Sequence, residues 1–383
     1  PGGTVYWTET LYDALGRTVQ VKQPNNSGTT TYTYSGPTVK VTDPTSKWKK
    51  YENDALGNLV KVTEPRPGGG TDYASDYTYS ELGQLLTVTM ARPGLGSNPA
   101  TVTQTRTWVY DSTTQRLTSV THPESGTTSF TYNSDGSMQR KTDQKGQKID
   151  YAYDSDGRVT STRRYLTGGT EDGCARVDYY YGSQTFDSSF TTNATGRLAA
   201  TATGCAGTGA GQLIEMYSYT SAGALTKKRL RIVRPGTSNY VDKDVSYTYG
   251  SDGKLATTTY PGYSVPFTMT YDLMDRPVKM TGPSMLYGNQ IDHAKDVVYG
   301  VAGQVTSMKY VQGETADVDG SGNPIGVPTF MTETKTYNAL FQLTRQTTGT
   351  VADIEYTYSS TANNGRITGR KNYVSGEDVI YSY

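Results

Sequence analysis

The residues that could support acid–base catalysis are few, and none stands in a recognisable catalytic pattern. The 383 residues include two histidines: His122 lies in a His-Pro-Glu-Ser-Gly turn, and His293 lies in a segment that we expect to be a surface loop. The sequence contains neither a Gly-x-Ser-x-Gly elbow nor a His-Glu-x-x-His pair. Its 36 acidic residues leave room for a glycosidase-type carboxylate pair, but most of them occupy turn positions. We therefore predict no catalytic residue and no enzymatic activity.

One segment begins like a calcium-binding loop. Asp317, Asp319, Ser321 and Asn323 follow the spacing of the first ligands of such a loop. The twelfth position, which requires a bidentate glutamate, is Pro328. This departure favours a glycine-rich hairpin tip over a metal site. We predict no cofactor, and calcium is the one ion for which candidate ligands can be tested.

Two cysteines, Cys174 and Cys205, lie 31 residues apart in a region rich in glycine and alanine. A single disulfide would be expected in an oxidising compartment. The spacing does not fix the distance between the two residues, so a disulfide and two free thiols both remain open.

Charge and hydropathy argue against nucleic acid and membrane as partners. The 36 basic and 36 acidic residues give a net charge of zero, which removes the long-range field that attracts a polyanion. The densest basic run, 227–231 with Arg234, lies near Tyr217 and Tyr219 and could combine charge with base stacking. Strand alternation instead predicts basic residues on both faces of a solvated strand. No segment approaches the ~18 apolar residues of a membrane span, so we also predict no membrane insertion.

A short sequence unit is repeated from one end of the chain to the other, so residue types are evenly distributed along it. Its clearest copies are Tyr12-Asp13-Ala14-Leu15-Gly16-Arg17 and Tyr153-Asp154-Ser155-Asp156-Gly157-Arg158. Further copies contain Tyr132 with Gly136, then Gly57, Gly253, Gly303, and Gly365 with Arg366. We find about thirteen copies, and no linker separates them. Residues 1–383 therefore form one predicted repeat array without a separate catalytic domain.

The chemistry of each copy is that of an antiparallel β-hairpin. Asp or Asn can accept hydrogen bonds from the backbone of its own turn, and glycine supplies a positive φ at a bulge. Strands such as Tyr151-Ala152-Tyr153 place both tyrosines on one face, where the rings can pack while their hydroxyls stay hydrated or hydrogen-bonded. Hydrophobic residues make up only 34% of the chain, too few for a conventional two-layer core. We predict an all-β meander whose many strands curl into a long spiralling strip.

The Tyr-Asp-x-x-Gly-Arg-Leu/Val units, with the Tyr-x-Tyr strands that precede them, resemble the YD repeats of the Rhs (rearrangement hotspot) family. Such repeats also occur in shell subunits of toxin complexes and in teneurins. The resemblance extends over 12–383 and implies tandem hairpins that form a hollow shell or tube on a secreted or cell-surface protein. The self-cleaving core segment and the toxic cargo domain of the family are not found in this sequence, so neither activity is carried over.

These expectations lead to three alternative functions for the protein. The first is a non-enzymatic structural and interaction protein, the β wall of a bacterial Rhs-like shell. Its expected partners are flanking domains of the same polypeptide or neighbouring copies. The second is an open extracellular filament built by end-to-end association, because the sequence begins and ends in repeat-like segments without a polar cap. The third is a carbohydrate- or surface-binding module, since tyrosine-rich sheet faces can stack on glycans.

Overall fold

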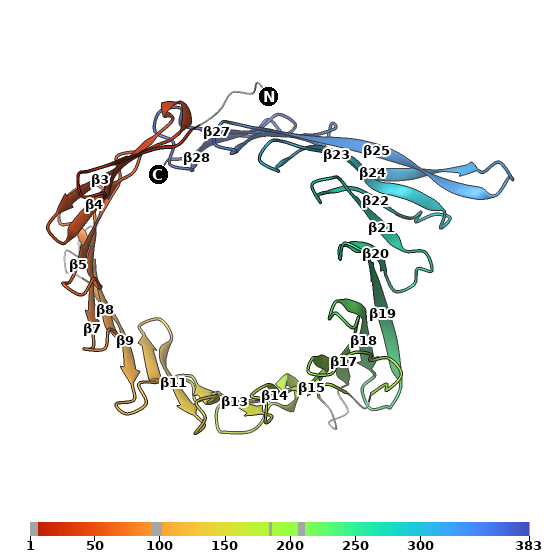
Figure 1. The fold of residues 1–383 in the computed structure, drawn as a ribbon, viewed down its shortest axis with the longest axis horizontal. Coiled ribbons are helices and arrows are strands. Elements are labelled where there is room, and N and C mark those ends of the chain that lie inside the picture. Colours follow the sequence, from red (N-terminus) through yellow and green to blue (C-terminus); the bar gives the residue numbers. More distant parts are fainter. Residues whose placement is uncertain (1–6, 93–101, 184–185, 206–210, 383) are drawn as a thin grey trace. The chain divides into compact units, whose positions relative to one another are not determined.

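The chain forms a single antiparallel β-sheet. The structure is a computed structural model, and it describes residues 7–92, 102–183, 186–205 and 211–382. Its sheet contains 29 strands, and the described residues include two one-turn 3-10 helices (Figure 1). The prediction of an all-β fold is confirmed.

The bounds of the strands are as follows. The first ten are β1 Glu9–Tyr12, β2 Thr18–Lys22, β3 Thr29–Ser35, β4 Thr38–Thr42, β5 Trp48–Asn53, β6 Leu59–Glu64, β7 Tyr73–Tyr79, β8 Leu85–Arg92, β9 Val102–Tyr110 and β10 Leu117–His122. The next ten are β11 Gly126–Tyr132, β12 Met138–Thr142, β13 Lys148–Tyr153, β14 Val159–Tyr165, β15 Val177–Tyr181, β16 Leu198–Gly204, β17 Gln212–Tyr219, β18 Leu225–Val233, β19 Tyr240–Tyr249 and β20 Leu255–Thr259. The last nine are β21 Phe267–Tyr271, β22 Pro277–Pro283, β23 Gln290–Tyr299, β24 Val305–Val318, β25 Pro324–Tyr337, β26 Leu343–Thr348, β27 Ala352–Tyr358, β28 Ile367–Asn372 and β29 Asp378–Ile380. The 3-10 helices are η1 Pro24–Asn26 and η2 Gly173–Ala175.

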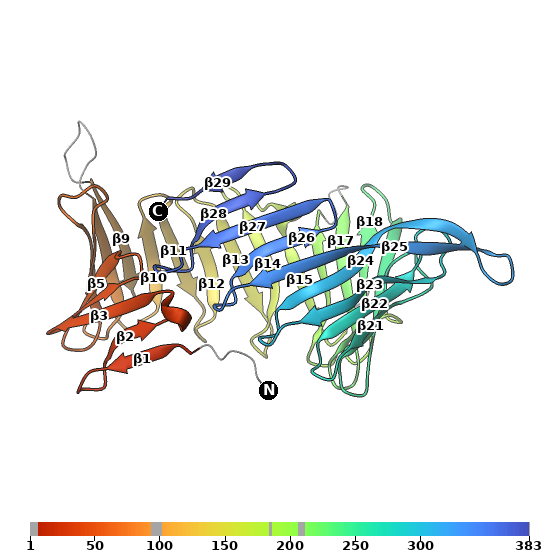
Figure 2. The same cartoon turned by 90° about the horizontal axis from the view of Figure 1, so that it is seen from above.

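Each strand pairs with its successor along the chain, as in β13 with β14 and β17 with β18. Figure 2 shows β11 to β15 side by side in this order. In such a meander, the turns that follow odd-numbered strands lie at one edge of the sheet, and the turns that follow even-numbered strands lie at the other. We call these edges the YD edge and the return edge, because the Tyr-Asp turns all lie at the first.

Contacts divide the chain into two compact units. Unit 1 contains Pro1–Trp108, Ala294–Gln312 and Phe330–Tyr383, and unit 2 contains Val109–His293 and Gly313–Thr329. Within unit 1, early and late segments of the chain meet. The Asn363 N–H donates to the carbonyl of Ser27 at 2.9 Å, and the Asn364 amide donates to the Asp43 carboxylate at 3.2 Å.

Little of the chain is deeply buried. The accessible surface is 22719 Å², against about 15,000 Å² expected for a compact monomer of this length. Most strand residues are half-buried, which agrees with a composition too poor in hydrophobic residues for a two-layer core. Unit 2 contains one local exception, in which Phe190, from the connection between β15 and β16, packs with alanines and large apolar side chains of β16 and β17. The other members of this cluster are Ala200, Ala202, Ile214 and Met216.

Within the described residues, none of the helices has the length and apolar character needed to cross a membrane.

Candidate functional site

The most regular site in the molecule is the Tyr-Asp turn, and its first copy shows the geometry. The Asp13 carboxylate accepts the backbone N–H of Leu15 at 2.9 Å and of Arg17 at 3.0 Å. The Arg17 guanidinium donates to the same carboxylate at 2.8 Å. Gly16 closes the turn with φ +76° and donates its N–H to the carbonyl of Asp13. One aspartate thus satisfies the turn backbone and also holds the basic residue that follows.

The same arrangement recurs through the array. Asp154 accepts from the backbone of Asp156 and Arg158, and the Arg158 side chain returns to it at 2.8 Å. The predicted turn glycines all have positive φ, between +76° and +93°: Gly16, Gly57, Gly136, Gly157, Gly253, Gly303 and Gly365. Among the described residues, three of these turns reach the left-handed region without glycine, at Gln115, Asp275 and Phe341. The turn geometry is therefore kept where the sequence signature is lost.

A register shift precedes many of these turns. Tyr153 pairs with Val159 although its neighbour Ala152 pairs with Ser161. The same one-residue bulge occurs where Tyr12 pairs with Thr18. A turn of this kind is the expected product of Asp-x-x-Gly sequences, because glycine in the left-handed region forms the bulge.

The tyrosine before the turn connects many of the hairpins to the preceding one. The Tyr153 hydroxyl donates to the backbone carbonyl of Met138, the first residue of β12, at 2.9 Å. We call this contact the tyrosine link. Within the part of the chain that the structure describes, nine tyrosines are seen to make it: Tyr34, Tyr79, Tyr132, Tyr153, Tyr219, Tyr249, Tyr271, Tyr337 and Tyr358. The acceptors are Thr18, Leu59, Leu117, Met138, Leu198, Leu225, Leu255, Val305 and Leu343.

The basic residue of the turn completes the receptor for that tyrosine. The Arg17 guanidinium lies 4.3 Å from the centre of the Tyr34 ring, and the Tyr34 hydroxyl bonds to the carbonyl of Thr18, the next residue after Arg17. Further cation–ring pairs of this kind are Arg116 with Tyr132, Arg158 with Tyr181, Arg197 with Tyr219, and Lys254 with Tyr271. The Gly-Arg-Leu portion of one turn therefore binds the tyrosine of the next.

One copy could not be found from glycine spacing. Between β3 and β4 the chain turns at Gly36 and Pro37, with Ser35 paired to Thr38 and no bulge. Tyr34 still makes the tyrosine link there. The sequence feature that marks this copy is the Tyr-x-Tyr strand Tyr32-Thr33-Tyr34, which precedes a shortened turn.

The charges at the turns are held in their ionised forms. Hydrogen bonds from the Arg17 backbone and side chain lower the pKa of Asp13, and the backbone N–H of Arg158 contributes most to lowering the pKa of Asp154. Burial raises the pKa of the linking tyrosine Tyr153. The site therefore combines an ionised carboxylate with a neutral phenol, which is suited to holding backbone and not to proton transfer at neutral pH.

Not every predicted turn residue takes part in the same way. Tyr12 is 62% exposed, and within the described residues no earlier hairpin offers it a carbonyl. The backbone N–H of Arg366 donates to Asn364, in a longer loop where Asn363 accepts the N–H of Gly365. This loop also carries the contacts to Ser27 and Asp43 in unit 1.

The calcium-like segment forms the tip of the β24–β25 hairpin. Asp319 accepts from the backbone of Ser321 and Asn323, as other turn aspartates do. The Asp317 carboxylate accepts the N–H of Val318. Within the described residues, no three His, Cys, Asp or Glu side chains group to hold a metal ion. The prediction of no cofactor, with these four residues as the calcium ligands to test, is not tested by the structure.

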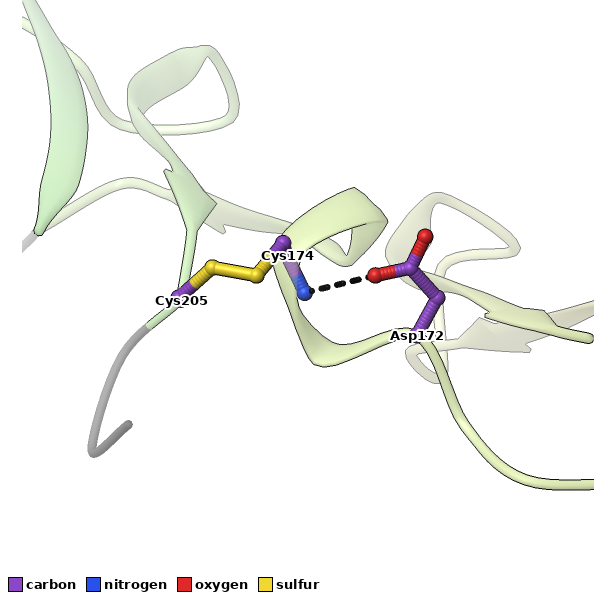
Figure 3. Close-up of a disulfide and its surroundings, with 3 residues drawn as sticks. All are labelled: Asp172, Cys174 and Cys205. Carbon is purple, nitrogen blue, oxygen red and sulfur yellow. Dashed lines mark hydrogen bonds between the residues drawn. A yellow bond between two sulfur atoms is a disulfide. The ribbon is translucent and has the colours of Figure 1, made fainter. Parts of the chain in front are cut away.

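The two cysteines form a disulfide at the return edge of unit 2. Cys174 lies in η2, and Cys205 follows β16 (Figure 3). The Asp172 carboxylate accepts the N–H of Cys174 at 3.1 Å and caps this short helix. The bond thus joins two connections that are separated by the strands β15 and β16.

Two expectations are wrong in detail. The basic run on β18 is not a solvated strand, because Arg231 is only 6% exposed and pairs with Asp242, its cross-strand neighbour on β19. Arg229 pairs in the same way with Asp244. His293 lies in strand β23 and not in a loop, with its Nε2 3.1 Å from the carbonyl of Pro283.

Comparisons with known proteins place the fold. No protein-family model matches the sequence, and no curated protein matches it. Solved structures do match: the TcdB2-TccC3-Cdc42 crystal structure has a TM-score of 0.70 at 13% identity, over 96% of this chain and 18% of that one. The present chain therefore has the same fold as the matching part of this structure.

Two further solved structures are similar to this chain in fold. TcdB2-TccC3 without its hypervariable C-terminal region has a TM-score of 0.71 at 13% identity, over 96% of this chain and 18% of that chain. The Tc holotoxin pore of Photorhabdus luminescens has a TM-score of 0.61 at 13% identity, over 98% of this chain and 22% of that chain. The present chain spans about a fifth of the length of these proteins.

Proposed function

We propose that this chain is a non-enzymatic segment of a YD-repeat shell wall, part of a secreted or cell-surface Rhs-like protein. The observation that supports this most is the tyrosine link, made by nine tyrosines at one hairpin interval after another. Each link attaches a hairpin to its predecessor without a central core, which is what a thin extended wall requires. The likeness to TcdB2-TccC3 over almost the whole chain supports the same interpretation.

Its partners are flanking parts of the same polypeptide or neighbouring copies of the chain, and no cofactor is needed for this role. The Cys174–Cys205 disulfide supports residence in an oxidising compartment, since such bonds are rare in reducing ones. Zero net charge and the paired basic residues of β18 disfavour nucleic acid as a partner.

The absence of catalysis is supported by how the aspartates are used. The carboxylates of Asp13 and Asp154 are occupied by turn backbone and arginine, so neither is free to act as an acid or a base. A screen of the purified chain against glycosidic and peptide substrates should give no turnover. Turnover that is lost on substitution of one acidic residue outside the turns would overturn the non-enzymatic proposal.

Electron microscopy of the natural full-length polypeptide separates the structural alternatives. A shell wall predicts discrete hollow particles in which this segment forms part of the boundary. Indefinite fibres that lengthen with concentration would instead establish the open filament and reject the shell.

A further inference from the structure

Unit 2 contains a pocket at its return edge that the wall does not explain. Its volume is about 340 Å³, and it lies over β12, β13 and β14 and against the connection that follows β14. Three basic residues line it, and the side chains of two of them, Lys141 and Arg164, lie on the same face of the sheet: Lys141, Lys148 and Arg164. Ile149, Tyr165 and Leu166 supply apolar surface.

The three cations stand apart from the other basic residues of these strands. Within the described part of the chain, the side chains of Lys141, Lys148 and Arg164 have neither an ion pair nor a hydrogen bond. By contrast, Arg140 on β12 and Arg158 beside β14 each pair with an aspartate. Exposed cations without partners are ordinary, but two that share one face of the pocket give that face a local positive charge.

Strand register brings two of these cations to the same face. Lys141 lies opposite Ile149, and Ile149 lies opposite Arg164, so the three residues form a row across β12, β13 and β14. Adjacent strands are ~4.8 Å apart, which places the two cationic residues about 10 Å from each other along the row. One anionic group over Ile149 is within reach of both long side chains.

Two carboxylates also line the pocket, and both have structural partners. Asp143 accepts the N–H of Lys145 and of Gln147, each at 2.9 Å. Asp172 accepts the N–H of Cys174. These contacts leave carboxylate lone pairs that can accept from hydroxyl groups. The lining therefore suits a ligand with one anionic group and several hydroxyls better than a bare anion.

The pocket is built from fixed backbone. The N–H of Asp172 donates to the carbonyl of Arg164 at 2.8 Å. The Thr167 hydroxyl donates to the carbonyl of Lys145 at 2.9 Å and joins the two return-edge turns. Ala175, which lines the pocket, follows Cys174 of the disulfide (Figure 3). A wall held in this way reduces the ordering cost of binding.

We propose that this pocket binds an acidic sugar, one monosaccharide unit that bears a carboxylate. Lys141 and Arg164 contact the carboxylate, and Asp143 and Asp172 accept from the hydroxyls. The volume is at the lower end of the range for small-ligand pockets, which limits the ligand to about one sugar ring. The apolar face of the ring packs on Leu166. The site is separate from the tyrosine links, so the wall and the sugar site can be tested independently.

Isothermal titration of the purified chain with N-acetylneuraminic acid and with glucuronic acid tests the proposal. We expect binding that weakens as salt is raised, because the contact is between opposite charges. Galactose and inorganic phosphate serve as competing probes. If galactose binds as tightly as the acidic sugars, charge has no role in the site. If phosphate binds as tightly, the pocket is a simple anion site and not a sugar site. If neither acidic sugar binds, the proposal is rejected.

Substitutions of pocket residues test whether the acidic sugar binds in this pocket. Lys141→Gln and Arg164→Gln should each weaken binding by about tenfold or more, since each removes a charge-assisted contact. Lys243→Gln is the matched control, because Lys243 is an exposed lysine of unit 2 away from the pocket. Circular dichroism and thermal melting confirm that each variant is folded. Loss of binding in Lys243→Gln, or unchanged binding in the two pocket variants, would contradict the assignment.

The disulfide supplies a second readout. The double variant Cys174→Ser with Cys205→Ser should stay folded yet bind the acidic sugar several-fold more weakly, because Ala175 and its loop are no longer held. Reductant should have the same effect on the natural chain and none on the double variant. Full affinity in the reduced chain would show that the wall of the pocket is not set by the disulfide. Particle shape in the electron microscope should not change in any of these variants, which keeps this test distinct from that of the shell.

Discussion

At the residue scale, tyrosine replaces the aliphatic side chains that this composition lacks. Its ring is half-buried on the sheet face, and its hydroxyl satisfies a backbone carbonyl of the preceding hairpin, as in Tyr153 with Met138. The sequence predicted the shared face and a hydrated or bonded hydroxyl. It could not predict the acceptor, because a backbone carbonyl has no sequence signature and the separation varies from 15 to 32 residues.

Removing one hydroxyl tests the tyrosine link. Tyr153→Phe keeps the ring but leaves the Met138 carbonyl without its donor, so we expect the free energy of unfolding to fall by about 1 kcal/mol. Urea unfolding followed by circular dichroism measures the change. Tyr151→Phe is the control, because within the described residues the Tyr151 hydroxyl has no protein partner. Equal losses in the two variants would show that the link adds nothing beyond the ring.

The linking tyrosines also predict an alkaline limit. Burial raises the pKa of Tyr79, Tyr153, Tyr219 and Tyr358 above the ordinary value of 10.0, so the fold favours the neutral phenol. Their contribution to stability is complete below pH 10 and is lost as the pH rises through the higher pKa of the folded state. Urea midpoints should therefore fall as the pH is raised through the range above about 10. A midpoint that stays constant over that range would contradict this role.

At the scale of the element, the turn is more regular than its sequence. Aspartate, glycine and arginine revealed most copies, and the predicted bulge is present where Tyr153 pairs with Val159. The two-residue turn at Gly36 and Pro37 has no such signature, so glycine spacing could not find it. The local core around Phe190 was missed for another reason: the burial of β16 and β17 depends on where a connection folds back, which alternation alone does not reveal.

Glycine at the turn can be tested without steric interference. Gly157 has φ +76°, and a Cβ added there would meet nothing within 4 Å. Gly157→Ala should therefore cost about 1–2 kcal/mol through backbone strain alone. Gly320→Ala is the control, because Gly320 is equally open but does not have a positive φ. The two urea midpoints should differ clearly, and identical midpoints would mean that the turn relaxes to another conformation at no cost.

At the scale of the whole molecule, stability comes from neighbouring hairpins and not from one centre. The large accessible surface and the scarcity of buried side chains both follow from a single sheet in which each hairpin contacts the next. The repeat and the composition were enough to predict this all-β, core-poor organisation. The contact of Ser27 and Asp43 with the 359–366 loop could not be predicted, because these segments lie more than 300 residues apart in the sequence.

Small-angle X-ray scattering of the isolated chain tests the central claim most directly. A compact protein of 383 residues has a radius of gyration of about 21 Å. A coreless wall predicts a clearly larger value at the scattering mass of a monomer, with a pair-distance distribution shifted to long distances. A radius near 21 Å with the symmetric distribution of a solid globule would contradict the account.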